Sequence, residues 1–331
     1  MSDNHPRRYR SLFWPLVLIG VGVVWLLVNL GVLSVNNLNL LLNLWPLLLV
    51  GIGLDLIFGR RSPVVGAVIG VLLVAAVVAL LILAPTLNIA GPSLQTRQIT
   101  EPLGNTETAN VDLDLSSYST NIYALSASST NLFEAEIHYV GNLDYSAQGS
   151  NGAMNIHLSH SGAFDWWFFP NFSGINTQWK IGLSPKAQLN LNINAASGSS
   201  DIDLTGLNLA KLSIDAASGS TNLRLPTSAQ SYTVDYQGAS GSADISLPAE
   251  TTLTLTLHGA SGSLSVSLPA TTAIQIQVND SGSGSISVPG SLTRISGSGK
   301  TGTWQSANYA TAETKVTIIV QDAGSGSISF N

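Results

Sequence analysis

The chain has 331 residues, of which 45% are hydrophobic and only 10% are charged, and its mean hydropathy is +0.29. These values argue against an ordinary soluble enzyme and favour a membrane protein with more than one domain. The sequence has no cysteine, which excludes disulfides, thiolate metal centres and thiol nucleophiles. Residues 1–84 carry five arginines and two aspartates, whereas the remainder carries eight basic and seventeen acidic residues, so we expect no nucleic-acid partner.

Three apolar runs lie near the N-terminus, at about 12–33, 38–58 and 64–84. Each approaches the roughly 20 residues that a helix needs to cross about 30 Å of hydrocarbon. We therefore predict a three-helix transmembrane anchor over residues 1–84, in contact with the lipid bilayer. A cleaved secretory signal is the alternative for the first run, but the run is long for a signal and no small-residue cleavage site follows it before the second run.

The flanking basic residues predict the orientation of this anchor. Three arginines precede the first run within residues 7–10, and Arg60 and Arg61 lie between the second and third runs. Because short cytoplasmic flanks are enriched in Lys and Arg, both clusters are expected in the cytoplasm. Three crossings from a cytoplasmic N-terminus then place residue 85 onward outside the cytoplasm, in a multi-pass protein of the cell membrane.

The first two runs are related by an internal repeat, since residues 13–22 (FWPLVLIGVG) return as residues 44–53 (LWPLLLVGIG). Small residues allow membrane helices to approach closely, so the candidates for helix–helix packing are Gly20, Gly22, Gly51 and Gly53. Residues 11–61 resemble the LiaI/LiaF-like transmembrane region of bacterial envelope-stress proteins. That resemblance implies a role in sensing envelope stress or in restraining a membrane sensor protein such as a sensor kinase.

A second repeat dominates the polar half of the chain. Ala-Ser-Gly-Ser recurs at 196–199, 217–220, 239–242 and 260–263, which places its glycines at intervals of 21, 22 and 21 residues. Between these turns, apolar and polar residues alternate, as in Leu189-Asn-Leu191-Asn-Ile193. Strict alternation is typical of strands that bury one face.

Two apolar columns can be followed through the repeats, with one member per period. The first contains Ile193, Ile214, Val234, Leu255 and Ile276, and the second contains Ile202, Leu223, Ile245, Val266 and Ile286. Two short strands cannot bury such a face alone, whereas stacked units join the columns into one core. We predict an all-β C-terminal domain over residues 105–331, a β-solenoid with coils of about 21 residues, after a linker at 85–104. The alternative is an antiparallel β-sandwich in which Ser-Gly-Ser closes hairpins.

Residues 187–289 resemble the adhesin-type β-solenoid domains, called toastrack domains, of bacterial envelope proteins. The resemblance implies surface adhesion or scaffolding, with a cell-envelope component as partner. Residues 105–186 alternate less cleanly and are expected to form earlier, irregular coils. Val316–Val320 and Ile328–Phe330 are expected to close the array at its far end. The sequence leaves open whether the protein forms homo-oligomers.

One aromatic segment breaks the polar pattern of this half. It contains Trp166, Trp167, Phe168, Phe169 and Phe172. Such side chains are expected either to cap the open end of the solenoid or to form a patch that docks on a partner or on the membrane.

Candidate chemistry is sparse. Residues 297–302 (GSGKTG) fit two phosphate-binding patterns, but no amphipathic helix follows, so we interpret them as a solenoid corner. His157 and His160 are three residues apart on a strand and should face opposite sides. We therefore predict no catalytic residues, no metal site and no cofactor. The competing class is a carbohydrate-acting β-helix enzyme, which would need several carboxylates that converge on one groove.

Overall fold

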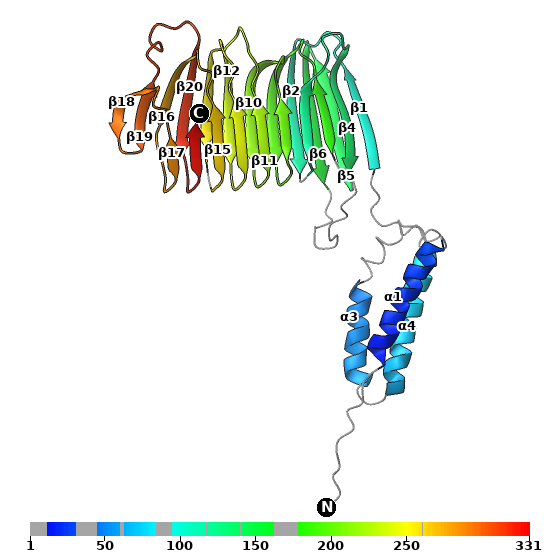
Figure 1. Cartoon of the computed structure of the whole chain (residues 1–331). Helices are drawn as coiled ribbons and strands as arrows, with labels where there is room; N and C mark the ends of the chain where they lie inside the picture. Colours follow the sequence, from blue (N-terminus) through cyan, green and yellow to red (C-terminus); the bar gives the residue numbers. More distant parts are fainter. Residues whose placement is uncertain are drawn as a thin grey trace, which may run out of the picture. The chain divides into compact units, whose positions relative to one another are not determined.

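A computed structural model describes residues 12–30, 45–59, 63–83, 95–116, 118–139, 141–161, 178–259 and 261–331. The chain divides into two compact units, and each is described by itself. The helical unit comprises residues 1–94 and 163–174, and the β unit comprises residues 95–162 and 175–331. Figure 1 shows the helices of the first unit and the layered strands of the second.

The helical unit contains three apolar helices within the described residues. They are α1 (Phe13–Asn29), α3 (Trp45–Leu54), which continues as a π-helical turn (Asp55–Gly59), and α4 (Pro63–Leu83). Each helix has a proline in its first turn, where the missing N–H costs no hydrogen bond. Helix α1 packs along α4 (Figure 1). Val24 and Leu81 are buried between neighbouring side chains.

Large apolar side chains cover the surface of these helices, as lipid contact requires. Leu18, Trp25 and Leu72 are each more than 60% exposed. Within the described residues, α4 is the helix whose length and composition suffice to cross a membrane, over Val64–Leu83, while the other two apolar helices are shorter. Residues 31–44, where the first expected span ends and the second begins, lie outside the described residues.

Two sheets face each other across one continuous core in the β unit. In spatial order, the described strands of sheet A are β1 (Gln95–Pro102), β4 (Asn131–Tyr139), β7 (Trp179–Leu183), β3 (Thr120–Ala124), β9 (Ser200–Asp203), β11 (Ser220–Arg224), β13 (Ser242–Ser246), β15 (Ser263–Ser267), β21 (Ser327–Phe330) and β17 (Ser285–Ser287). Those of sheet B are β18 (Thr293–Ser298), β19 (Thr301–Gln305), β16 (Ala273–Val278), β20 (Lys315–Asp322), β14 (Leu253–His258), β12 (Tyr232–Gly238), β10 (Asn208–Ala216), β8 (Gln188–Ala195), β2 (Thr108–Ser116), β6 (Ala153–Ser161) and β5 (Asn142–Ser150).

The middle of each sheet is parallel, because each coil of the chain adds one strand to sheet B and one to sheet A. Strands β8, β10, β12 and β14 pair in this order in sheet B, and β9, β11, β13 and β15 follow the same order in sheet A. Alternation then buries Leu189, Leu191 and Ile193 and turns the intervening asparagines outward, as predicted. This parallel stacking is a solenoid and excludes the hairpin sandwich for these coils.

The first predicted apolar column is wrong at two steps, between Ile214 and Val234 and between Leu255 and Ile276, since Ile318 of β20 separates the latter two. The structure pairs Ile214 with Tyr236 and Leu212 with Val234, so Ile214 and Val234 are not partners. The turn glycines Gly219 and Gly241 are 22 residues apart, and the same spacing from Ile214 leads to Tyr236. A buried tyrosine therefore fills the position at which sequence analysis placed an aliphatic residue.

The expected order of coils also fails near both ends. Strands β20 and β21 do not close the array. Strand β20 lies between β14 and β16 in sheet B, and β21 lies between β15 and β17 in sheet A. Consequently Ile286 does not follow Val266, and it pairs with Ile328 instead. At the opposite end, the coil of β2 and β3 lies between the coils of β6–β7 and β8–β9.

Antiparallel strands cover the ends of the stack. Strand β5 pairs with β6, β4 joins β1 to β7, and β19 joins β18 to β16. Strand β1 begins at Gln95, inside the segment predicted as a linker at 85–104. Residues 297–302, predicted as a solenoid corner, form the tight turn of the β18–β19 hairpin, with Gly297 opposite Gly302.

Candidate functional site

The corner that leads into sheet A forms a long polar groove, which we call the Ser–Gly–Ser groove. It has a volume of about 920 Å³ and is open along its length. Each of five stacked coils contributes two exposed serines with a glycine between them, and Lys300 lies at one end. In spatial order these serines are Ser218 and Ser220, Ser240 and Ser242, Ser261 and Ser263, Ser325 and Ser327, and Ser283 and Ser285.

The glycines form the floor of this groove because the backbones of successive coils are in direct contact there. A Cβ atom on Gly241 would lie 2.0 Å from the carbonyl oxygen of Gly219, and one on Gly262 would lie 1.8 Å from that of Gly241. No side chain can be accommodated at such distances. The floor is therefore bare backbone, flanked by two rows of serine side chains.

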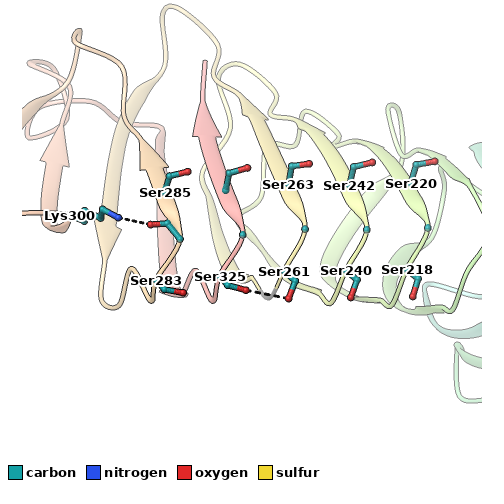
Figure 2. A pocket seen from close by; sticks show the side chains of 16 residues that line it. Ser218, Ser220, Ser240, Ser242, Ser261, Ser263, Ser283, Ser285, Lys300 and Ser325 are labelled. Carbon is teal, nitrogen blue, oxygen red and sulfur yellow. Dashed lines mark hydrogen bonds between the residues drawn. The ribbon is translucent and has the colours of Figure 1, made fainter.

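A ladder of backbone hydrogen bonds runs along this floor. Ser242 N donates to Gly219 O (3.2 Å), Ser263 N donates to Gly241 O (3.2 Å), and the same pattern continues through the next coils. The last carbonyl, of Gly284, accepts a hydrogen bond of 2.6 Å from Lys300 Nζ (Figure 2). Lys300 thus supplies the donor that a further coil would otherwise provide.

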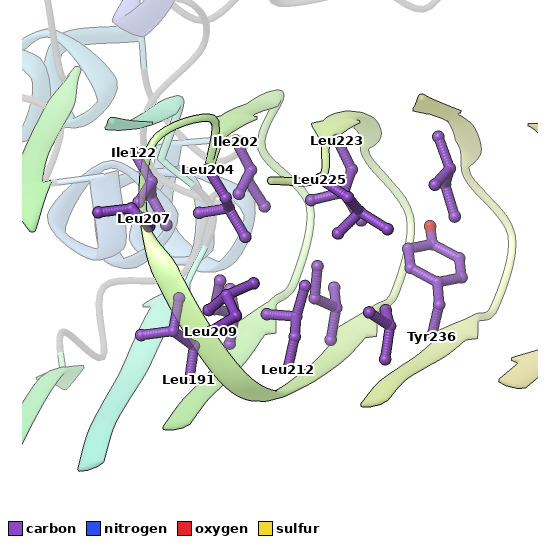
Figure 3. Close-up of a cluster of buried hydrophobic side chains, with 14 of the residues drawn as sticks. Ile122, Leu191, Ile202, Leu204, Leu207, Leu209, Leu212, Leu223, Leu225 and Tyr236 are labelled. Carbon is purple, nitrogen blue, oxygen red and sulfur yellow. The ribbon is translucent and has the colours of Figure 1, made fainter. Parts of the chain in front are cut away.

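The core behind the groove holds the coils in register. Figure 3 shows Ile202 and Leu223 of sheet A filling the space between the sheets together with Leu191 and Leu212 of sheet B. All four side chains are at most 2% exposed. Because tightly packed aliphatic rows fix the spacing of the layers, the serine pairs repeat at about 4.8 Å.

Apart from Lys300 at one end, the groove offers only neutral hydrogen-bonding groups. Each hydroxyl can donate one hydrogen bond and accept two. The residues that line the groove are serines, glycines and Lys300, with no imidazole or carboxylate to act as a general base. The arrangement is suited to binding a polar ligand along its length.

The outer face of sheet B carries a second polar surface, formed by strands β2, β6 and β8. Asn110 Nδ2 donates to Asn155 Oδ1 (2.7 Å) and Asn190 Nδ2 donates to Asn110 Oδ1 (2.9 Å). In the next row, Asp112 accepts from Asn192 Nδ2 (2.8 Å) and lies 2.9 Å from His157 Nδ1. These side chains largely satisfy one another, so this ladder stabilises the sheet and is a weaker binding candidate than the groove.

The carboxyl groups with shifted acidity are held in separate ion pairs. The hydrogen bond and charge of Lys180 lower the pKa of Glu136. Burial raises the pKa of Asp203, but hydrogen bonds from Thr205 and the charge of Arg224 outweigh it and leave that pKa below its ordinary value. Neither carboxyl has the raised pKa of a general acid, and in the described residues no group of three His, Asp or Glu side chains could hold a metal ion.

The four glycines predicted to mediate helix packing fall into two classes. A Cβ atom on Gly20 would lie 2.4 Å from Val74 Cγ2, and one on Gly51 would lie 2.7 Å from Leu73 Cδ1, so both face α4 closely. Gly22 and Gly53 have no such neighbour within 4 Å.

The predicted aromatic residues Trp166, Trp167, Phe168, Phe169 and Phe172 lie outside the described residues. The nearby Trp179 is described and belongs to the core. Its side chain is fully buried, its Nε1 donates to His138 O (3.1 Å), and its ring stacks on Tyr118. The Ser–Gly–Ser groove was not predicted as a site, although the repeated tetrapeptide is the sequence signal that could have revealed it.

Comparisons with known families match both units. Residues 13–99 match the family described as the LiaF transmembrane domain, and residues 90–247 match the family described as the N-terminal domain of toast_rack, DUF2154. The chain thus combines a LiaF-like transmembrane region with a toast-rack domain, as the sequence resemblance implied, and it is a membrane-anchored envelope protein. No curated protein matches the sequence.

Several solved structures are similar to this chain over about 70% of its length. A "putative cell adhesion protein" from Clostridium sporogenes is 15% identical and has a TM-score of 0.49, with 72% of this chain and 99% of that chain covered. A "putative adhesin" from Bacteroides fragilis is 11% identical with a TM-score of 0.28, at the same coverage. A "putative lipid binding protein" from Parabacteroides distasonis is 12% identical with a TM-score of 0.22, with 71% and 96% covered.

Proposed function

We propose that the β unit is a non-enzymatic, extracytoplasmic binding module for an extended polymer of the cell envelope. The supporting observation is the Ser–Gly–Ser groove, which repeats one pair of hydroxyls per coil on a floor that no side chain interrupts. A ligand with its own regular repeat can use the same contact many times, whereas a small molecule would use only one or two coils.

The charge of the chain narrows the class of polymer. Residues 85–331 carry seventeen acidic and eight basic side chains, which disfavours a strongly anionic ligand. Serine hydroxyls both donate and accept, so they match the hydroxyl and amide groups of an uncharged glycan strand, directly or through bridging water. The proposed ligand is therefore a neutral, hydroxyl-rich glycan.

A binding assay with the full-length protein in lipid nanodiscs tests this proposal. Ser242→Tyr and Ser263→Tyr together would block two coils of the groove, and we expect retention on isolated cell walls to fall about tenfold. The matched control is Thr233→Tyr with Gln237→Tyr, which places two tyrosines at exposed positions of β12 on the other sheet. Equal retention of both double variants would contradict the proposal.

We also propose the orientation that this function requires, with the N-terminus in the cytoplasm and the β unit outside it. It is supported by the basic residues that flank the apolar runs of residues 12–33 and 38–58. Protease added to intact cells stripped of their outer layers should degrade the β unit while it spares a tag at the N-terminus. Protection of the β unit under these conditions would contradict the assigned topology.

The helical unit supports a second candidate function, which is restraint of a membrane sensor protein. Its support is the match to the LiaF transmembrane domain together with the exposed apolar surface of α1 and α4. A photo-crosslinking residue at Leu72, which is 64% exposed, should capture a sensor kinase, whereas one at the buried Leu81 should not. Equal capture at both positions would argue against a specific helix contact.

A further inference from the structure

The C-terminal 17 residues form one complete coil that lies between two coils made earlier in the chain. Strand β20 pairs with β14 on one side and with β16 on the other, each time in parallel register. Strand β21 does the same between β15 and β17. Spatial order and chain order therefore differ, and residues 315–331 occupy an interior layer between strands that precede them in the chain.

The neighbours of this segment define a slot for it without any of its own residues. Leu268–Thr272 carries the chain from β15 to β16 across the layer that the segment fills. Leu255 of β14 and Ile276 of β16, both fully buried, pair with Ile318 from either side. Without the segment, β14 and β16 would each present an unpaired strand edge and an aliphatic row to the empty layer.

The segment fits this slot through both packing and hydrogen bonds. Its inward side chains are each at most 2% exposed and comprise Val316, Ile318, Val320, Ala323, Ile328 and Phe330. Beyond the ladders of β20 and β21, Gly259 N donates to Asp322 O (2.8 Å) and Leu268 N donates to Asn331 O (2.8 Å). Affinity thus comes from the backbone, and specificity comes from the matched aliphatic row, as in strand addition to an open sheet edge.

We propose that the slot also accepts the C-terminal coil of a second copy of this chain, so that two copies exchange residues 315–331. The segment is joined to β19 by residues 306–314, which step over the end of β16 and include several exposed positions. In an exchanged pair this connection turns outward instead of back over β16. Every contact inside the slot is then retained, which makes exchange of this element a low-cost route to a dimer.

Attachment to a common membrane favours this exchange. Copies held in one bilayer meet at a higher effective concentration than copies free in solution. The proposal concerns association between copies and does not depend on the polymer that the groove binds.

Cysteine pairs provide a direct test, because the chain has no cysteine of its own. Thr256 of β14 and Ile319 of β20 are register partners on the outer face of sheet B. Adjacent strands are about 4.8 Å apart, within the Cα separation that a disulfide can bridge. Full-length Thr256→Cys and Ile319→Cys chains with different tags would be produced in the same cells, oxidised in isolated membranes and resolved on a non-reducing gel.

We expect a disulfide-linked heterodimer from these two chains. The matched control is the pair Asn192→Cys and Ser213→Cys, which are register partners in the consecutive strands β8 and β10 and should link only within one chain. A chain that carries both Thr256→Cys and Ile319→Cys calibrates the chemistry by closing within itself when no exchange occurs.

Two outcomes would overturn the proposal. One is complete closure within the doubly substituted chain, with no more heterodimer from the mixed pair than from the control pair. The other is failure of the doubly substituted chain to link at all, which would contradict the register on which the slot depends. Deleting residues 309–312 supplies a second measurement, because a shortened connection has less slack for stepping over β16 and should increase the dimeric fraction several-fold.

Discussion

Glycines in the two units solve different packing problems. In the helices, Gly20 and Gly51 leave room for the side chains of Val74 and Leu73, which have some freedom to move. In the coils, Gly219, Gly241 and Gly262 leave room for the backbone of the next layer, which has none. The difference shows that glycine can be replaced at a moderate cost in stability where it faces a side chain, whereas it is obligatory where it faces a carbonyl group.

The largest loss of stability is expected when a methyl group is added to the groove floor. Gly241→Ala would force a Cβ atom to within 2.0 Å of Gly219 O, so the two coils must separate. We expect a loss of about 3 kcal/mol in the free energy of unfolding. Thermal denaturation of the β unit within the full-length protein would measure it. The control Gly290→Ala has no atom within 4 Å of the new Cβ and should change stability by less than about 0.5 kcal/mol.

A smaller loss of stability is expected when glycines in the helices are replaced by alanine. Gly20→Ala places a methyl group against both γ carbons of Val74, whereas Gly51→Ala meets mainly the mobile end of Leu73. We expect costs of about 1–2 kcal/mol at Gly20 and about 1 kcal/mol or less at Gly51. Thermal unfolding of the detergent-solubilised protein would rank them. Gly22→Ala and Gly53→Ala serve as controls, and a cost at Gly22 equal to that at Gly20 would contradict the packing described.

Removal of the terminal hydrogen bond of the ladder should have a local effect. In Lys300→Ala, water replaces Lys300 Nζ at Gly284 O, and the global cost should be no more than about 1 kcal/mol. Hydrogen exchange should nevertheless accelerate at the amides of β17, which is the edge strand of sheet A. Unchanged exchange there would show that the lysine does not stabilise this end of the stack.

The smallest effect concerns an exposed ion pair and depends on pH. Lys180 lowers the pKa of Glu136 below its ordinary value of 4.5, so the pair stabilises the fold above that pH and ceases to do so as the carboxylate is protonated. The difference in melting temperature between the protein and Lys180→Ala should therefore shrink as the pH falls below 4.5. A difference that grew on acidification would contradict the assignment.

The sequence contains enough information to predict the faces of the strands but not their order. Alternation at Leu189, Leu191 and Ile193 shows which side chains are buried, and this prediction is confirmed. Spacing of the turn glycines could have placed Tyr236 beside Ile214, but the preference for an aliphatic residue favoured Val234 instead. Val316–Val320 alternates like any other inward row, so no local signal indicates that it lies between β14 and β16.

The candidate site was only partly predictable for a similar reason. Ser-Gly-Ser can close a hairpin or form a corner, and the groove exists only when corners of neighbouring coils lie side by side. Lys300 belongs to a hairpin that sequence analysis interpreted as a corner, so its contact with Gly284 depends on the tertiary structure.

The interior place of the last coil has a consequence for biosynthesis. A ribosome that stops before residue 315 would release a chain in which β14, β16, β15 and β17 each keep an uncovered strand edge, and such surfaces are what proteases and chaperones recognise. The stack can therefore close only after residues 315–331 have been synthesised.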